Sequence, residues 1–161
     1  MAVFDKDIIL IEGDYTNDPD DSGGETKYGI SKNSYPHEDI KNLTIERAIE
    51  IYTRDFWNPN NLSSIQDQTT ANLVFRFIVN AGKDTAIRTL QECLNTFVPI
   101  IPSVNIDGVL GKRTLQAINN IRTIRLHDTF RVATCRYYLN LVKRKPSQVK
   151  YFKGWINRAL M

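Results

Sequence analysis

The sequence predicts a mainly α-helical protein with one short β-hairpin near its N-terminus. From about residue 40 onward, apolar residues recur at the three- and four-residue spacing of helices that bury one face. Residues 14–31 lack this period, contain turn-forming residues and a Gly-Gly pair, and end in a short strand-like run at 26–30. With 161 residues, of which 42% are hydrophobic, the chain is long enough for a globular domain with its own core.

The first element expected is a short helix that begins after Asp5 and ends near Gly13. Asp is a favoured residue at a helix N-cap, and residues 8–11 follow it as an apolar run. This helix would place Glu12 in its last turn, immediately before the segment that is rich in turn residues.

The rest of the chain is expected to be a succession of helices. Residues 67–81 are apolar on more than one side, which predicts a central, buried helix ended by Gly82. Asp84 is expected to cap the next helix. Further helices are predicted at residues 44–57, 84–97, around 115–118 and 122–142, followed by an apolar closing segment at 152–156.

A proline-containing connector at residues 98–105 suggests where the chain divides. We expect a catalytic lobe at residues 1–84 and a helical C-terminal lobe at residues 85–161. Neither half has obvious material for an independent core, so we expect the two lobes to pack as one compact unit.

Charge is distributed unevenly along the chain. Acids outnumber bases in residues 1–55, whereas residues 122–158 contain ten bases and one acid, Asp128. A basic segment favours contact with polyanions such as cell-wall polymers or nucleic acid, and a set of solvated helix faces is the alternative.

The N-terminal apolar run is too short, and its flank too acidic, for a signal peptide. No apolar run reaches the length of a membrane span. We therefore expect no stable membrane insertion and accumulation in the cytoplasm. A target outside the membrane would require release by a separate membrane-permeabilising factor.

No metal or cofactor is expected. Cys93 and Cys135 lie in helix-like patterns and predict buried free thiols, and no Cys/His spacing is typical of zinc. Residues 18–23 match the opening of a calcium loop, D-x-D-x-S-G, but the closing bidentate position falls on Gly29, which has no ligating side chain. An EF-hand is therefore disfavoured, and an irregular ion site is the alternative.

Two carboxylates in contrasting surroundings are the main candidates for catalysis. Glu12 follows apolar residues, and burial there would raise its pKa, whereas a second carboxylate on the polar loop, such as Asp21, would stay ionised. Such a pair performs glycoside hydrolysis. The alternatives are a solvent-exposed glutamate at a helix end and an aspartate that only stabilises its own turn.

Residues 12–31, EGDYTNDPDDSGGETKYGIS, resemble the signature of glycoside hydrolase family 108, approximately E-G-G-Y-x-N-x-P-x-D-x-G-G-x-T-x-x-G-I-T. FIVNAG at 77–82 resembles a helix end of the same family, F-x-x-V-N-x-G, with one residue fewer between Phe77 and Val79. DGVLGKRT at 107–114 resembles the D-G-x-x-G-P-x-T turn of the associated peptidoglycan-binding region. FKGWINR at 152–158 resembles the F-x-x-G-W-x-N-R ending of that region, with one residue fewer between Phe152 and Gly154. The resemblance thus covers nearly the whole chain.

This resemblance implies an N-acetylmuramidase of bacterial or phage type, endolysins included, with a lysozyme-like fold. Carried over by position, Glu12 matches the catalytic glutamate, Asp21 the aspartate of the loop, and Thr26 the threonine after the glycine pair. Asp14 replaces a glycine of the signature. Its charge would raise the pKa of Glu12 further, or its side chain would disturb the turn if that position needs a positive φ. Two further departures, Ser31 for threonine and Lys112 for proline, carry no such consequence.

Three residues are candidates for binding the glycan. Tyr28 and Trp57 offer aromatic faces for sugar rings, and Asn80 offers an amide for an N-acetyl group. Packing in the core is the alternative for both aromatic residues, and capping of its own helix is the alternative for Asn80. In the C-terminal lobe, the D-G-V-L-G motif at 107–111 is expected to form a turn rather than to bind ligand.

The partner implied by the resemblance is the glycan strand of peptidoglycan, bound by a monomer, with no nucleic acid involved. Two other classes of function stay open. One is a non-catalytic wall-binding protein of the same fold, which the substitution at Asp14 favours. The other is a nucleic-acid-binding protein that uses the basic C-terminal helix, and it predicts strongly salt-dependent binding to DNA.

Overall fold

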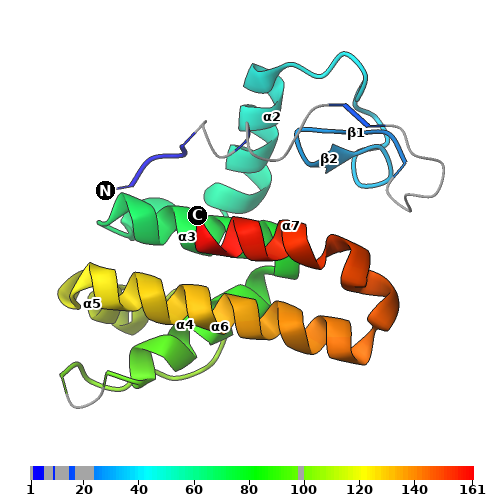
Figure 1. Cartoon of the computed structure of the whole chain (residues 1–161). Coiled ribbons are helices and arrows are strands. Elements are labelled where there is room, and N and C mark those ends of the chain that lie inside the picture. The colour runs from blue at the N-terminus through cyan, green and yellow to red at the C-terminus, as the bar shows by residue number, and fades with distance from the viewer. Residues whose placement is uncertain (1, 6–8, 10–14, 17–23, 98–99) are drawn as a thin grey trace. The chain divides into compact units, whose positions relative to one another are not determined.

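The computed structural model describes residues 2–5, 9, 15–16, 24–97 and 100–161 (Figure 1). These residues form six α-helices, labelled α2 to α7, and one two-stranded antiparallel hairpin. The prediction of a mainly helical fold with a short hairpin is therefore confirmed. The chain divides into two compact units, residues 4–59 and residues 60–161 together with residues 1–3.

The unit of residues 4–59 contains the hairpin, made of β1 (Thr26–Lys27) and β2 (Ile30–Ser31). Thr26 pairs with Ser31, and Lys27 with Ile30. The two residues between the strands, Tyr28 and Gly29, have φ angles of 52° and 74°. Positive φ at both positions is the requirement of a type I′ turn, which matches the twist of paired strands. The single strand expected over 26–30 is therefore wrong in detail, because the turn falls in its middle.

Helix α2 (Ile45–Tyr52) follows in the same unit. Its N-cap is Thr44, whose hydroxyl accepts a hydrogen bond from the backbone N–H of Arg47 at 3.2 Å. The helix continues into a π-helical turn, η1 (Thr53–Trp57), so the helical segment ends at Trp57 as the sequence predicts. The core of this unit includes four side chains that are at most 1% exposed: Ile30, Ile40, Ile51 and Trp57.

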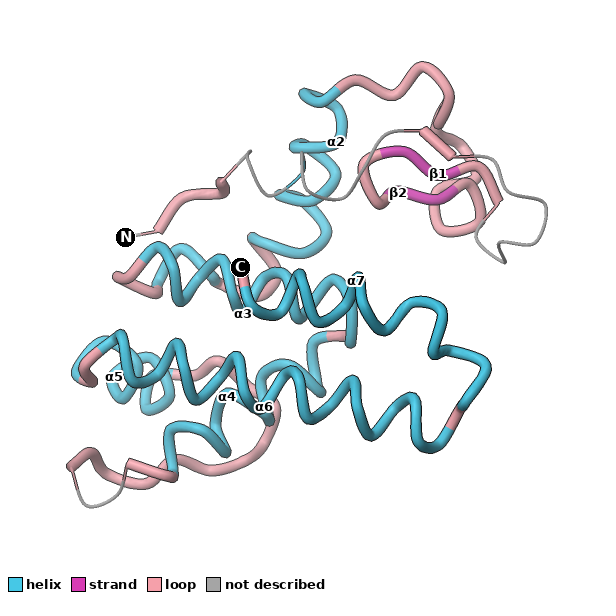
Figure 2. Tube along the Cα trace, viewed as in Figure 1, coloured by secondary structure: helices cyan, strands magenta, loops and turns pink. Residues whose placement is uncertain are grey.

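The second unit is helical. It comprises α3 (Gln68–Ala81), α4 (Lys83–Asn95), α5 (Lys112–Asn120), α6 (Thr123–Arg144) and α7 (Val149–Leu160), with 3₁₀ turns η2 (Leu62–Ser64) and η3 (Pro146–Gln148). Helix α3 packs against α4, α6 and α7. Figure 2 shows α6 and α7 as an antiparallel pair, joined through η3.

Helix α3 is buried on more than one side, as its sequence predicts. The ring of Phe77 lies edge-on to Phe130 at 5.8 Å and to Tyr137 at 5.2 Å between centroids, and Tyr138 stacks on Trp155 at 5.2 Å. These aromatic contacts connect α3 to α6, and α6 to α7.

The predicted cap of α4 is wrong. The helix begins at Lys83 directly after Gly82, whose φ is 84°, so no residue of a separate loop is available as a side-chain cap. Asp84 lies in the first turn instead and forms an ion pair with Arg88, one turn further on, at 2.8 Å.

The helix expected over residues 5–13 lies largely outside the described residues, although Ile9 is described and fully buried. No helix in the described part of the chain is long and apolar enough to cross a membrane. Cys93 is buried and Cys135 half-buried, and both are free thiols. Burial raises the pKa of Cys93 to about 12.

Candidate functional site

The hairpin positions Thr26, one of the three predicted catalytic residues. Its hydroxyl donates to the carbonyl of Gly24 at 3.1 Å, and its backbone exchanges two hydrogen bonds of 2.8 Å with Thr16. Thr16 follows Glu12 by four residues and precedes Asp21 by five. Glu12 and Asp21 lie outside the described residues, as does Asp14. Thr16, which lies between the two carboxylates in the sequence, is therefore paired with the strand that carries Thr26.

Tyr28 occupies the turn of the hairpin and is half-buried. Its carbonyl accepts a hydrogen bond from the hydroxyl of Tyr52 in α2 at 2.9 Å. The ammonium of Lys27 lies 5.4 Å from the centre of the Tyr28 ring, within the range of a cation–π contact. Helix α2 thereby holds the turn in place while part of the Tyr28 side chain stays accessible.

The other two predicted glycan contacts have different surroundings. Trp57 is 1% exposed and meets Phe4 edge-on at 5.6 Å between ring centroids, so it packs in the core of its unit. Asn80 belongs to the other unit, in the last turn of α3, and its amide donates to the carbonyl of Arg76 at 2.8 Å. Sugar binding by these two side chains stays a prediction.

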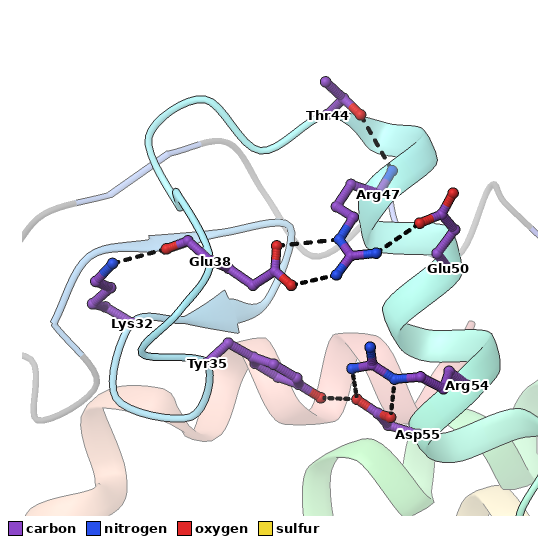
Figure 3. A network of polar contacts seen from close by, with 8 residues as sticks. All are labelled: Lys32, Tyr35, Glu38, Thr44, Arg47, Glu50, Arg54 and Asp55. Carbon is purple, nitrogen blue, oxygen red and sulfur yellow. Dashed lines mark hydrogen bonds and ion pairs between the residues drawn. The ribbon is translucent and has the colours of Figure 1, made fainter.

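A network of charged residues holds the segment after the hairpin onto α2 (Figure 3). The guanidinium of Arg47 makes two hydrogen bonds to the carboxylate of Glu38 and one to Glu50, at 2.8 Å. Lys32 donates to the carbonyl of Glu38 at 2.8 Å. The hydrogen bond from Arg47 holds the pKa of Glu38 below its usual value, so this carboxylate is ionised at neutral pH.

The second part of this network is centred on Asp55. The Arg54 guanidinium donates to both carboxylate oxygens at 2.6 and 2.7 Å, and the hydroxyl of Tyr35 donates to one of them at 3.0 Å. The bond from Arg54 lowers the pKa of Asp55. Burial and the neighbouring Asp55 raise the pKa of Tyr35 to about 12. Glu38 and Asp55 are therefore both ionised and paired, which makes them unsuited to donating a proton.

In the helical unit, a buried amide organises the motif DGVLGKRT. Gln91 of α4 is fully buried, and its NH₂ group donates to Asp107 Oδ1 at 2.8 Å, to the carbonyl of Val109 at 3.0 Å and to Thr114 Oγ1 at 3.2 Å. Its carbonyl oxygen accepts from the backbone N–H groups of Asp107 and Gly108, both at 3.0 Å. The motif is a turn built around one glutamine, in agreement with its expected role.

Two hollows lie beside α5, immediately after this turn. One, of about 610 Å³, is bounded by residues 101–104 and α5. The other, of about 630 Å³, is bounded by residues 61–66, residues 110–111 and α5. Among the described residues, no group of three His, Cys, Asp or Glu side chains is placed to hold a metal ion.

Comparison with known proteins assigns the two halves of the chain. Residues 6–82 match the family model described as Glycosyl hydrolase 108, and residues 85–160 match the model described as Predicted Peptidoglycan domain. The protein has a glycosyl hydrolase 108 domain followed by a predicted peptidoglycan-binding domain. The family resemblance of the sequence motifs is confirmed, and the protein is a glycosyl hydrolase whose second domain implies peptidoglycan as the polymer.

A solved structure described as "Structure of Brucella abortus SagA" is similar to the chain, with a TM-score of 0.73 and 24% sequence identity. The match covers 95% of this chain and 85% of that chain. At this identity the similarity establishes the fold. No curated protein matches the chain.

Sequence reasoning missed two features of this glycosyl hydrolase. The pairing of Glu38 with Arg47 spans nine residues across a loop and has no local signal. Gln91 did leave a signal, because it lies four residues after Ile87 and three before Leu94, on the apolar face of its helix. A polar side chain in such a position must find buried hydrogen-bond partners.

Proposed function

We propose that the protein hydrolyses the β-1,4 bond between N-acetylmuramic acid and N-acetylglucosamine in peptidoglycan, as a lysozyme-type enzyme. The observation that carries the proposal is the succession of the two matched domains, a glycosyl hydrolase 108 domain and a predicted peptidoglycan domain, along one chain. The first defines the reaction class, and the second points to the polymer.

Glu12 is the proposed general acid. Protonated at the working pH, it would give its proton to the oxygen of the leaving sugar. Two described acids of the same unit, Glu38 and Asp55, are held ionised by arginines, and this supports a proton donor elsewhere in the domain.

Asp21 and Thr26 are proposed to act on the other side of the scissile bond. Asp21 would stabilise the oxocarbenium-like transition state, and either activate the attacking water or replace it as nucleophile. A carboxylate separation of about 5 Å would favour the retaining path, and one of about 6.5–9.5 Å the inverting path. Thr26 supports this assignment through its place on β1, where the backbone of Thr16 is bonded to it.

The glycan is proposed to lie against the hairpin, with the half-buried ring of Tyr28 as a contact for one sugar. We further propose a division of labour between residues 1–84, which would cleave the glycan, and residues 85–161, which would hold the wall. The protein would remain in the cytoplasm until another factor permeabilises the membrane, as a phage or prophage endolysin does.

The test is the release of reducing sugar ends from purified peptidoglycan. Glu12→Gln should lower the rate by about 10² to 10⁴ while the protein stays folded. Glu46→Gln is the matched control, since Glu46 is an exposed glutamate of α2 that forms no hydrogen bond or ion pair with a described residue.

Each outcome of this test has a distinct meaning. Equal activity of native protein and Glu12→Gln would contradict the role of Glu12. If the native protein releases no reducing ends but sediments with the wall, the non-catalytic wall-binding function replaces the proposed one. Salt-sensitive binding to DNA without wall lysis would instead support the nucleic-acid alternative.

A further inference from the structure

Helix α5 has a hollow on each side, and the two hollows share the side chains of Gln116 and Asn120. The first opens between α5 and residues 101–104, and the second between α5 and residues 61–66. Because they adjoin at these two amides, they form one trough that crosses α5. Each hollow is large enough for one or two residues of a polymer.

The trough is lined by amides and cations above an apolar base. Ile101, Val104 and Ala117 contribute apolar surface to the first hollow, and Lys112 and Arg113 contribute positive charge, one to each hollow. None of the described residues that line either hollow is acidic or aromatic. A sugar site would be expected to offer an aromatic face, whereas amides and cations suit peptide groups and carboxylates.

Side-chain amides fix the walls of the trough through hydrogen bonds to the backbone. The side-chain amide of Asn95 accepts a hydrogen bond from the backbone N–H of Val104 and donates one to the carbonyl of Val104, each at 2.9 Å. Asn119 accepts from the N–H of Gln66 at 2.9 Å and donates to the carbonyl of Ser64 at 3.2 Å. Together with the Gln91 cluster, these contacts hold all three segments around α5 in one arrangement, which reduces the cost of ordering them on binding.

The polar side chains that face outward are not used by the fold. Lys112, Arg113, Gln116 and Asn120 are all exposed, and none forms a hydrogen bond or ion pair with a described residue. By contrast, Arg88 of the neighbouring helix is paired with Asp84. Four polar groups on a rigid, concave surface are therefore available to a ligand.

We propose that this trough binds the stem peptide of peptidoglycan, through its free carboxylates and peptide groups, rather than the glycan strand. The inference rests on the proposed function, since it takes peptidoglycan as the substrate. Lys112 and Arg113 would pair with carboxylates of the peptide, and Gln116 and Asn120 would bind its amide groups. The predicted peptidoglycan domain would then bind the peptide while the hydrolase domain cleaves the glycan.

The test measures binding of a synthetic peptide to the full chain by isothermal titration calorimetry and by shifts of labelled side-chain amides. The probe is N-acetyl-L-Ala-γ-D-Glu-meso-diaminopimelic acid, and its fully amidated form is the matched ligand. We expect the acid to shift the resonances of Gln116 and Asn120 and to bind about tenfold or more tightly than the amidated peptide. The double variant Lys112→Gln/Arg113→Gln should lose about tenfold in affinity for the acid.

The control variant is Lys83→Gln/Arg125→Gln, which removes the same charge from exposed side chains outside the trough. It should bind the peptide as the native chain does. If both double variants lose the same affinity for the peptide, the effect comes from net charge alone, and the proposed site is contradicted. If chitotetraose shifts the side-chain resonances of Gln116 and Asn120 and the peptide does not, the trough binds glycan rather than peptide.

The outcome is separable from that of the proposed function. Reducing ends released by a native chain that fails to bind the peptide would contradict only the trough. Peptide binding by a native chain that releases no reducing ends would contradict only the hydrolase assignment.

Discussion

In residues 4–59, two carboxylates that bond to segments distant in sequence also pair with arginines, whereas around α5 most of the side-chain hydrogen bonds between distant segments are made by neutral amides. Glu38 is held by Arg47, and Asp55 by Arg54 and Tyr35. In the helical unit, the neutral amides of Gln91, Asn95 and Asn119 make hydrogen bonds between distant segments. The first unit pairs its two arginines with its own carboxylates, whereas the cations beside α5 have no ion-pair partner among the described residues. Positive charge is therefore available to a ligand beside α5.

The largest effect on stability is expected from Gln91→Leu. This change removes five hydrogen bonds and leaves two backbone N–H groups of the turn, those of Asp107 and Gly108, without their acceptor. Buried unsatisfied groups are costly, so we expect a loss of about 3–5 kcal/mol in the free energy of unfolding. Urea denaturation measures this, with Gln116→Leu, on the exposed face of α5, as the control. A loss below about 1 kcal/mol would show that neutral amides do not organise this unit.

The next effect concerns a charged contact between two helices of the helical unit. Asp67, the N-cap of α3, contacts His127 of α6 at 2.7 Å and accepts from the N–H and hydroxyl of Thr70 at 2.8 and 2.6 Å. Asp67→Ala should cost about 2 kcal/mol, because a cap and a bond between two helices are both lost. The control is Asp128→Ala, which removes an exposed aspartate of α6. If both variants lose the same free energy of unfolding, the contacts of Asp67 do not stabilise the protein more than an exposed aspartate does.

The contacts of Asp67 also predict a pH dependence. Burial raises the pKa of Asp67, but the hydrogen bonds from Thr70 and His127 outweigh burial, and the net pKa is lowered. A carboxylate whose pKa is lower in the folded state contributes stability above its unfolded pKa and loses it as pH falls through the folded pKa. Native protein should therefore lose stability below about pH 4, and Asp67→Asn should lose less over the same range. Identical pH profiles from thermal unfolding would contradict this.

A smaller effect is expected at the turn that Gln91 holds. Gly108 has a φ of 74°, and an added Cβ would lie 2.5 Å from Asp84 Oδ1. Since the exposed Asp84 carboxylate can move aside, the cost of Gly108→Ala is mainly the left-handed backbone, about 1 kcal/mol. Gly154→Ala is the control, because a Cβ there meets nothing within 4 Å and alanine favours the helix. Thermal unfolding should place the two variants on opposite sides of the native protein.

Most of the fold was accessible to prediction from sequence because its signals are local. The buried helix at 67–81 and the long helix at 122–142 follow from spacing alone, and the structure places α3 and α6 there. The predicted start of α4 is wrong because Gly82 joins two helices without a loop, and this depends on a backbone conformation rather than on a capping side chain. The position of the hairpin turn was likewise hidden, since Tyr28 is not a typical residue at positive φ.

Sequence motifs predict which residues belong to the candidate site, but they do not predict the contacts between those residues. The spacing of Glu12, Asp21 and Thr26 identifies the family, and no physical rule applied to the sequence supplies the distances between their side chains. Pairings such as Gln91 with Asp107 or Asp67 with His127 join residues 16 and 60 positions apart. Such partners are chosen by tertiary packing, and periodicity does not encode them.

The smallest effect is expected from Glu38→Gln in the charged unit. The substitution keeps the size of the side chain but removes the charge that pairs with Arg47, whose guanidinium retains Glu50 as a partner. The pair is partly exposed, with 41% of the Arg47 and 20% of the Glu38 side chain accessible. Such pairs contribute little and are screened by salt, so the loss in Tm should be below that of Gly108→Ala and should vanish near about 1 M NaCl. Glu46→Gln, which removes an exposed acid of α2 that forms no ion pair with a described residue, gives the baseline. If Glu38→Gln instead lowers stability as much as Gln91→Leu, and salt does not change the loss, ion pairs stabilise this fold as strongly as buried amides do. The cations beside α5 that have no described ion-pair partner would then need an explanation other than binding of a ligand.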